Sequence, residues 1–323
     1  MRPVITVIEP EGPEEWFAPL KEYFDVRFYR PKGALSPSEV SSLLDSSFGV
    51  IITSATSIGN DQLDCAARLK IIAKCGGPPS NLDVAHAEAR GIVVTCTPGA
   101  NTTTIAEYTI MLMIAALRGF GDHLAAVRRC SWRSAGTFLG HDLRDSVVGI
   151  VGLGAIGTEV VKRLLPFGCK IRVFTPHPSA TPGCEFVHSL EELLSQCDVV
   201  SLHCRVTPET VNLLNAENLR LMRPGAVLIN TARGALVDET ALSETLKHGP
   251  LGAAAVDVFQ QEPPPANHPL LSCKNALLTP HSSGWTLEAL RRECTGAVDS
   301  IIAFVQGRPI PGLLTSKFSK NGR

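Results

Sequence analysis

Three residues of types that act in many enzyme active sites occur in the C-terminal half of the chain: Arg233, Glu262 and His281. Each comes shortly after a short apolar segment of the kind that forms a buried strand. An arginine can hold a carboxylate through two parallel hydrogen bonds, and a glutamate next to a histidine fixes its tautomer and favours its protonated form. If the three segments are neighbouring parallel strands, their carboxyl ends open into one crevice. The sequence therefore predicts a site that binds a carboxylate and transfers a proton.

A glycine-rich turn lies upstream of these residues. Gly152, Gly154 and Gly157 follow a run of valine and isoleucine, and residues 158–167 have the pattern of a helix. In a strand–turn–helix unit the first glycine permits the tight turn, the second lets the backbone approach a pyrophosphate, and the third lets helix and strand pack closely. The helix N-terminus then offers free N–H groups to the phosphates. This segment predicts a dinucleotide-binding site.

The end of the next expected strand, residues 171–174, bears on which dinucleotide binds. Thr175 stands where such domains commonly place a carboxylate that accepts a hydrogen bond from the adenosine ribose. No arginine follows that would attract a 2′-phosphate, and His177 is a weaker substitute for one. We therefore expect NAD as the cofactor, with NADP possible and weak discrimination between the two.

The composition excludes several other classes of protein. The 323 residues carry a formal net charge of −1, which gives no electrostatic attraction to nucleic acid or to an anionic membrane. The apolar run 110–117 is far shorter than a membrane span, and the run 4–8 is too short for a signal peptide. The ten cysteines form no Cys-x-x-Cys pair and lack zinc-ligand spacing, so no metal site is expected. They are typical of reduced thiols in a cytoplasmic protein.

Short apolar runs alternate with amphipathic stretches, as in α/β proteins with parallel sheets. We expect strands at residues 4–8, 49–53, 69–73, 92–95, 171–174, 199–203, 226–230, 253–258 and 276–279, and just before Gly152. Further helices are expected from near residues 190, 216, 239 and 269, and at 287–306. The helix that begins near Asn101 is apolar on almost every side between Ile105 and Leu117, so it must be buried on more than one side.

With these motifs the chain resembles the D-isomer-specific 2-hydroxyacid dehydrogenases, a family that includes phosphoglycerate, glycerate and formate dehydrogenases. The resemblance runs from about Leu69 to the final helix. It is carried, in this order, by GLGAIG at 152–157, LMRPGA at 221–226, NTARGALVDE at 230–239, DVFQQEP at 257–263 and TPH at 279–281. It implies two Rossmann-like, doubly wound parallel-sheet domains. A central dinucleotide-binding domain, residues 100–286, would be inserted in a flavodoxin-like substrate domain, residues 1–99 plus 287–323.

The resemblance also implies an activity, hydride transfer between a nicotinamide cofactor and a small D-2-hydroxy acid or 2-oxo acid. Arg233 would bind the substrate carboxylate, His281 would donate the proton, and Glu262 would hold His281 protonated. Asp257 would hydrogen-bond the nicotinamide carboxamide. The other cofactor contacts would come from Gly152, Gly154, Ala155, Ile156, Gly157, Thr175, His203 and Thr231. A homodimer built on the helix 105–117 is implied too.

The expected substrate loop departs from the common family pattern. It would cradle the carboxylate with backbone groups near Cys75, Gly76 and Gly77, but two prolines follow and stiffen it. Lys74, just before the loop, either attracts an anionic substituent or is solvated. Trp285 either lines the substrate pocket or only packs against other side chains.

Two other interpretations stay open. One is a dinucleotide-sensing interaction protein, as in the corepressor branch of the same family, in which the cofactor shifts a conformational equilibrium. The other is a dehydrogenase acting on a compound such as phosphite or formate. The sequence does not name the 2-hydroxy acid.

Overall fold

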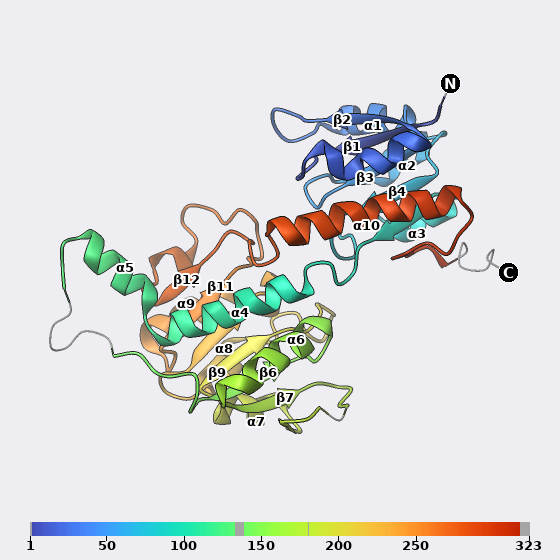
Figure 1. Ribbon diagram of the computed structural model, residues 1–323. Coiled ribbons are helices and arrows are strands. Elements are labelled where there is room, and N and C mark those ends of the chain that lie inside the picture. Colours follow the sequence, from blue (N-terminus) through green and yellow to red (C-terminus); the bar gives the residue numbers. More distant parts are fainter. Residues whose placement is uncertain (1, 133–138, 180, 317–323) are drawn as a thin grey trace. The chain divides into compact units, whose positions relative to one another are not determined.

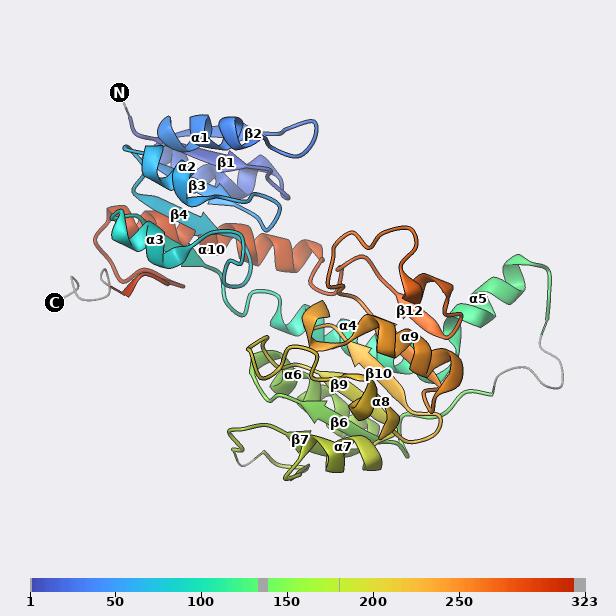
Figure 2. The same ribbon diagram turned by 180° about the vertical axis from the view of Figure 1, so that it is seen from behind.

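The computed structural model describes residues 2–132, 139–179 and 181–316. The chain forms two compact units (Figures 1 and 2). Unit 1 comprises Met1–Asn101 and Trp285–Arg323, and unit 2 comprises Thr102–Gly284.

Unit 1 is built on a parallel sheet of five strands in the order β2-β1-β3-β4-β5, which is the flavodoxin-like order. The strands are β1 (Val4–Ile8), β2 (Asp25–Tyr29), β3 (Gly49–Ile52), β4 (Ile71–Lys74) and β5 (Val93–Cys96). One face packs against the long helix α10 (Leu287–Val305) and the 3-10 helix η1 (Glu14–Glu22). The other face packs against α1 (Pro37–Asp45), α2 (Asn60–Cys65) and α3 (Val84–Ala89).

Unit 2 is built on a parallel sheet of seven strands in the order β12-β11-β10-β9-β6-β7-β8. Read from β6, this is the dinucleotide-binding order 3-2-1-4-5-6 with one strand added. The strands are β6 (Val147–Val151), β7 (Lys170–Phe174), β8 (Cys184–Phe186), β9 (Val199–Leu202), β10 (Val227–Asn230), β11 (Ala253–Val256) and β12 (Ala276–Leu278). The two doubly wound sheets confirm the predicted fold class.

Helices cover both faces of the unit 2 sheet. One face packs against α4 (Thr102–Leu117) and α6 (Ala155–Leu164). The other packs against α7 (Leu190–Gln196), α8 (Ala216–Arg220), α9 (Glu239–His248) and the 3-10 helix η4 (Pro269–Ser272). Two further 3-10 helices are η2 (Leu165–Phe167) and η3 (Gly234–Leu236).

Three details differ from the expected elements. Helix α6 begins at Ala155 rather than at Thr158, because Gly154 is already its N-cap. The segment from Pro269 is a four-residue 3-10 helix and not an α-helix. The edge strands β2 and β8 were not expected from the sequence.

The apolar helix α4 is buried mainly inside its own unit. Ile110 and Met113 are 8% and 0% exposed, and α4 packs against α6 and the sheet. Helix α5 (Phe120–Arg128) follows it, has no buried residue, and stands away from the sheet in both views (Figures 1 and 2). Among the described residues, no single helix is long and apolar enough to cross a membrane; only α4 and α5 taken together, bent by 66°, have the length and composition.

Candidate active site

Glu262 and His281 meet on the loops that follow β11 and β12. The Nδ1 atom of His281 lies 2.6 Å from Oε2 of Glu262. The other carboxylate oxygen, Oε1, accepts a hydrogen bond of 2.9 Å from the backbone N–H of Phe259. The carboxylate is therefore fixed from one side and orients the imidazole from the other. This arrangement leaves Nε2 of His281 as the ring nitrogen for proton exchange.

A second His–Glu pair in unit 2 is buried, which distinguishes it from the pair formed by His281 and Glu262. Nε2 of His268 lies 3.0 Å from Oε2 of Glu239, but their side chains are only 8% and 12% exposed. The side chains of His281 and Glu262 are 48% and 37% exposed. The pair at 268 and 239 ties η4 to α9, whereas the pair at 281 and 262 is open to a ligand.

Asp257 holds the turn that carries His281. Its Oδ1 accepts hydrogen bonds from the Thr279 hydroxyl at 2.6 Å and the Ser282 N–H at 2.9 Å, and its Oδ2 accepts from the Ser283 N–H at 2.9 Å. Burial raises the pKa of Asp257, but the hydrogen bonds from Thr279, Ser283 and Ser282 outweigh it, so the net pKa is lowered. His281 itself has a positive φ of 51°, a conformation that needs such support. To bind the nicotinamide carboxamide, Asp257 would have to accept a hydrogen bond from its N–H₂ group in competition with these donors.

Arg233 follows β10, the strand next to β11, and is exposed. The Asn230 side chain donates a 2.9 Å hydrogen bond to the Arg233 carbonyl, and Nη1 of Arg233 donates one of 2.7 Å to the Ala232 carbonyl. A Cβ on Gly234 would lie 2.0 Å from the carbonyl carbon of Phe259. The loop that carries Arg233 is therefore packed directly against the loop that leads to Glu262.

The glycine-rich turn is tightly packed at two of its glycines and open at the third. Gly152 has a φ of +93°, and a Cβ there would lie 2.7 Å from the backbone nitrogen of Cys204. A Cβ on Gly157 would lie 2.3 Å from the carbonyl oxygen of Gly152, so the helix packs closely on the turn. Gly154, by contrast, faces open space, with no atom within 4 Å of a Cβ. Ala155 and Ile156, in the first turn of α6, present their N–H groups beside that space.

Three other predicted cofactor residues lie at strand ends of the same sheet. Thr175 follows β7, is half-buried, and accepts a hydrogen bond of 3.4 Å from the N–H of His177. His203 follows β9, and burial lowers its pKa to about 4, so it brings no positive charge to the phosphates at neutral pH. Thr231 follows β10, but its hydroxyl is buried and lies 2.9 Å from that of Thr109 on α4. The Thr231 side chain therefore braces the strand end.

The predicted substrate residues lie in unit 1. The N–H of Cys75 bonds to the Ile52 carbonyl and that of Gly76 to the Thr97 hydroxyl, at 2.9 and 2.7 Å. Of the three backbone N–H groups expected to bind a carboxylate, only that of Gly77 lacks a partner among the described residues. Lys74 is 4% exposed, so it is not the solvated lysine of one expectation. Trp285 is 62% exposed at the start of the second segment of unit 1.

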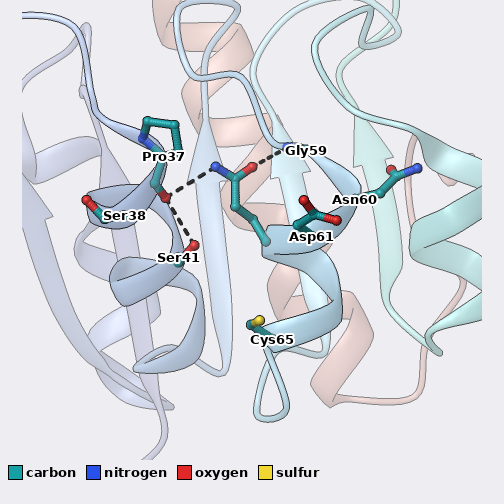
Figure 3. Close-up of a pocket in the computed structure, with 8 residues that line it drawn as sticks. Pro37, Ser38, Ser41, Gly59, Asn60, Asp61 and Cys65 are labelled. Atoms are coloured by element: carbon teal, nitrogen blue, oxygen red, sulfur yellow. Dashed lines mark hydrogen bonds between the residues drawn. The ribbon is translucent and has the colours of Figure 1, made fainter.

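A groove in unit 1 contains none of the predicted site residues. It has a volume of about 560 Å³ and lies between α1 and α2 (Figure 3). Gln62 crosses it, with Nε2 donating to the Pro37 carbonyl at 3.2 Å and Oε1 accepting from the Gly59 N–H. Because this bridge joins the two helices, the groove is part of their packing.

Sequence reasoning missed several residues that shape these regions. The hydroxyls of Tyr108 on α4 and Ser282 beside His281 lie 3.0 Å apart. Glu293 on α10 is 8% exposed, next to the substrate loop. The only signal for Glu293 in the sequence is a carboxylate on the apolar face of an amphipathic helix, which is an unusual position for a charged residue.

Comparisons with known proteins agree with this architecture. Residues 110–283 match the family model "D-isomer specific 2-hydroxyacid dehydrogenase, NAD binding domain". The chain is 36% identical over 317 residues to the glyoxylate reductase of Thermofilum pendens, covering 95% of this chain and 93% of that protein. It is 37% identical over 262 residues to the D-3-phosphoglycerate dehydrogenase of Methanocaldococcus jannaschii, covering 80% of this chain but only 50% of that longer protein.

Among solved structures, the TT0316 protein from Thermus thermophilus is similar over almost the whole chain. Its TM-score is 0.90 at 37% identity, with 96% of this chain and 99% of that chain covered. The family model spans more than half of the chain, and the Thermofilum relative spans nearly all of it. The chain therefore belongs to the D-isomer specific 2-hydroxyacid dehydrogenase family and contains its NAD-binding domain.

Proposed function

We propose that the protein reduces a small 2-oxo acid to the D-2-hydroxy acid, and catalyses the reverse reaction, with NAD(H) or NADP(H). The observation that carries the proposal is the exposed Glu262–His281 pair, 2.6 Å apart at the carboxyl ends of β11 and β12. Arg233 follows the adjacent strand, so an anion-binding group and a proton donor border the same edge of the sheet.

In the proposed mechanism each residue has one task. The Arg233 guanidinium binds the substrate carboxylate through two hydrogen bonds and polarises the adjacent 2-oxo group. His281 gives the proton on Nε2 to the 2-oxo oxygen as C2 receives a hydride, and Glu262 stabilises the imidazolium before transfer. The nicotinamide, when bound, supplies that hydride. His281 then takes a proton from water, which restores the starting state.

The cofactor site proposed for unit 2 uses the turn from Gly152 to Gly157 and the first turn of α6. The open space at Gly154, beside the N-terminus of α6, supports placing the pyrophosphate there. Thr175 at the end of β7 is proposed to face the adenosine ribose. We propose NAD as the usual cofactor, with NADP accepted.

Residues 1–99 and 287–323 are proposed to form the substrate domain. The N–H of Gly77 is offered to the substrate carboxylate, and Lys74, Cys75, Gly76 and Trp285 shape the surrounding surface. Residues 100–286 are proposed to form the dinucleotide-binding domain, which also carries Arg233, His281 and Trp285.

A homodimer is proposed from the exposed apolar face of α5. Phe120, Leu124 and Val127 lie at helical spacing on one face and are 51%, 43% and 60% exposed. Trp132 and Leu139 are 76% and 84% exposed. Such a surface is usually covered by a partner, and we propose a second copy of this chain. We also propose a cytoplasmic location, because all ten cysteines are free thiols. No nucleic acid or membrane partner is proposed, because the formal net charge of −1 gives no electrostatic attraction to either.

A panel of 2-oxo acids, assayed with NADH and with NADPH, tests the activity. At least one acid should be reduced. His281→Ala should then lower kcat by about 10²–10⁴-fold with cofactor affinity retained, whereas His248→Ala, which removes an exposed histidine at the end of α9, should not. Cofactor binding without turnover of any acid would refute the enzyme proposal and favour a dinucleotide-sensing role. Near-normal kcat in His281→Ala would refute its role as proton donor.

A further inference from the structure

The buried histidine–glutamate pair of unit 2 contacts the loop that carries Glu262. Glu239 is the first residue of α9, His268 is the residue before η4, and their side chains are only 12% and 8% exposed. Oε2 of Glu239 lies 3.0 Å from Nε2 of His268. Oε1 accepts a 2.8 Å hydrogen bond from the backbone N–H of Gln260. Both oxygens of this carboxylate are therefore in use, and one of them holds the loop two residues before Glu262.

His268 contacts the same loop at a second point. Its ring lies edge-on to that of Phe259, with centroids 5.5 Å apart and an angle of 89° between the rings. The backbone N–H of Phe259 donates to Oε1 of Glu262, and Oε2 of Glu262 lies 2.6 Å from Nδ1 of His281. A continuous set of contacts therefore runs from the buried pair, through residues 259 and 260, to the exposed pair.

The hydrogen bonds also indicate the tautomer of each imidazole. Nδ1 of His268 accepts from the Leu270 N–H at 3.4 Å, so its Nε2 carries the proton and donates to Glu239. In the exposed pair it is Nδ1 of His281 that faces Glu262. The neutral imidazoles of the two pairs are therefore expected to be opposite tautomers.

We propose that Glu239 and His268 are positioning residues for the reaction. By fixing the backbone at residues 259 and 260, they hold Glu262 in contact with His281, and they act through Glu262 and not on the substrate. Their part in catalysis rests on the proposed function, whereas the coupling between the two pairs does not.

Nitrogen-15 NMR of the histidine-labelled protein, without cofactor or substrate, measures this coupling. At a pH at which the imidazoles are neutral, the unmodified protein should show His281 with its proton on Nδ1 and His268 with its proton on Nε2. The loss of signals in His281→Ala and in His268→Phe assigns them. A proton on Nδ1 of His268 would overturn the proposal, because the contact with Glu239 would then not be the hydrogen bond on which it depends.

Glu239→Gln tests whether the buried pair controls the exposed one. A glutamine has a single acceptor oxygen, so it can serve Gln260 or His268 but not both. The loop should then shift, Nδ1 of His281 should lose its fixed acceptor, and the population of the Nε2–H tautomer of His281 should increase. An unchanged His281 tautomer in a folded Glu239→Gln protein would overturn the proposal.

Steady-state kinetics give a second readout. Glu239→Gln should lower kcat by about tenfold or more, since a small misplacement of a catalytic group is costly, while KM for the 2-oxo acid should change much less. His268→Phe keeps a ring beside Phe259 but removes the donor to Glu239, so it should have a smaller effect of the same kind. If Glu239→Gln does not fold, His268→Phe decides the question: normal kcat and an unchanged His281 tautomer would refute the proposal.

Asp198 provides a matched control at the other end of the same sheet. Its carboxylate accepts hydrogen bonds from the Val147 N–H at 2.8 Å and from Nη1 of Arg223 at 2.6 Å, so it too joins a backbone N–H to a basic side chain. Asp198 directly precedes β9. Asp198→Asn should lower the free energy of unfolding but leave the His281 tautomer and kcat as they were. The same changes as in Glu239→Gln would mean that lost stability alone explains them, and the proposal would fail.

Combining Glu239→Gln with Glu262→Gln tests the route of the effect. If Glu239 acts through Glu262, the double variant should differ in kcat from Glu262→Gln by no more than about twofold. Two effects that multiply would mean that Glu239 acts independently of Glu262, which contradicts the proposal. If no 2-oxo acid is reduced, the proposed function fails, but the NMR comparison still decides whether the buried pair positions Glu262.

Discussion

The carboxylate of Glu262 is held by the Phe259 N–H on one oxygen and by His281 on the other. Because one oxygen contacts the imidazole of His281, the negative charge of Glu262, and not only the shape of its side chain, matters for catalysis. A neutral amide could keep the contact with Phe259 but could not stabilise an imidazolium to the same extent.

Glu262→Gln should therefore shift the pH dependence of 2-oxo acid reduction. Without the negative charge the protonated form of His281 is less stable, so His281 loses its proton at lower pH and the decline in kcat/KM on the alkaline side should move to lower pH. A pH–rate profile with saturating cofactor measures this. An unchanged profile would show that the 2.6 Å contact does not control the proton donor.

The cofactor preference also depends on a single residue. Thr175 follows β7 and carries no charge, so it does not repel a 2′-phosphate. Thr175→Asp should increase the preference for NADH over NADPH by about tenfold or more, which corresponds to about 1.4 kcal/mol. Thr175→Asn introduces a neutral side chain of the same size as aspartate. It is the control and should change the preference between NADH and NADPH little. A preference of about a thousandfold in the unmodified protein, roughly 4 kcal/mol, would mean that another residue contacts the ribose.

At the scale of elements, the turn 279–283 depends on the buried carboxylate of Asp257. Asp257→Asn places an amide N–H₂ opposite one of the donors and should lower the free energy of unfolding by about 1–3 kcal/mol. It should also lower kcat, because His281 is no longer held in its left-handed conformation. Thr279→Val removes one of the donors and should cost less, about 1 kcal/mol. Chemical denaturation and steady-state kinetics check both; Asp257→Asn with normal kcat would show that the turn holds without it.

The predictability of the elements follows from burial. Central parallel strands such as β3, β9 and β10 are buried on both faces, so they are continuous apolar runs that the sequence reveals. The edge strand β2 is half-buried and alternates charged with apolar residues, and β8 has three residues, so neither has this signal. The predicted start of α6 was wrong because its N-cap is Gly154. A glycine has no side chain to form a capping hydrogen bond, so the sequence does not mark the start of the helix.

For the whole molecule, strand order explains why the candidate site could be inferred in part. Arg233, Glu262 and His281 come after three adjacent strands. Once the sheet was expected to be parallel, the sequence therefore predicted that all three lie at the same end of the sheet. The hydrogen bonds that occupy Asp257, the backbone of Gly76 and the side chain of Thr231 join segments far apart in sequence. Such contacts depend on side-chain packing, which no local pattern encodes.

Assembly is the prediction at this scale. Leu124→Glu or Val127→Glu on α5 should convert the dimer into a monomer. The monomer should still be folded, with native circular dichroism, because neither side chain is buried in unit 2. Leu221→Glu, equally exposed at 42% but after α8, is the matched control and should remain dimeric. Light scattering measures the mass. A monomeric unmodified protein would contradict the proposed dimer, and substitutions at the buried Ile110 or Met113 would test folding instead.

The contact at Gly234 constrains how this site can change over evolutionary time. Because a Cβ there would lie 2.0 Å from the Phe259 carbonyl carbon, the anion-binding loop and the loop of the proton donor's partner occupy adjoining space with no room between them. A mutation or insertion in one loop therefore has to be accompanied by a change in the other. Among aligned homologues, a residue other than glycine at position 234 should therefore occur only together with a changed length of the segment 258–261, and new substrate preferences should arise mainly by substitutions elsewhere.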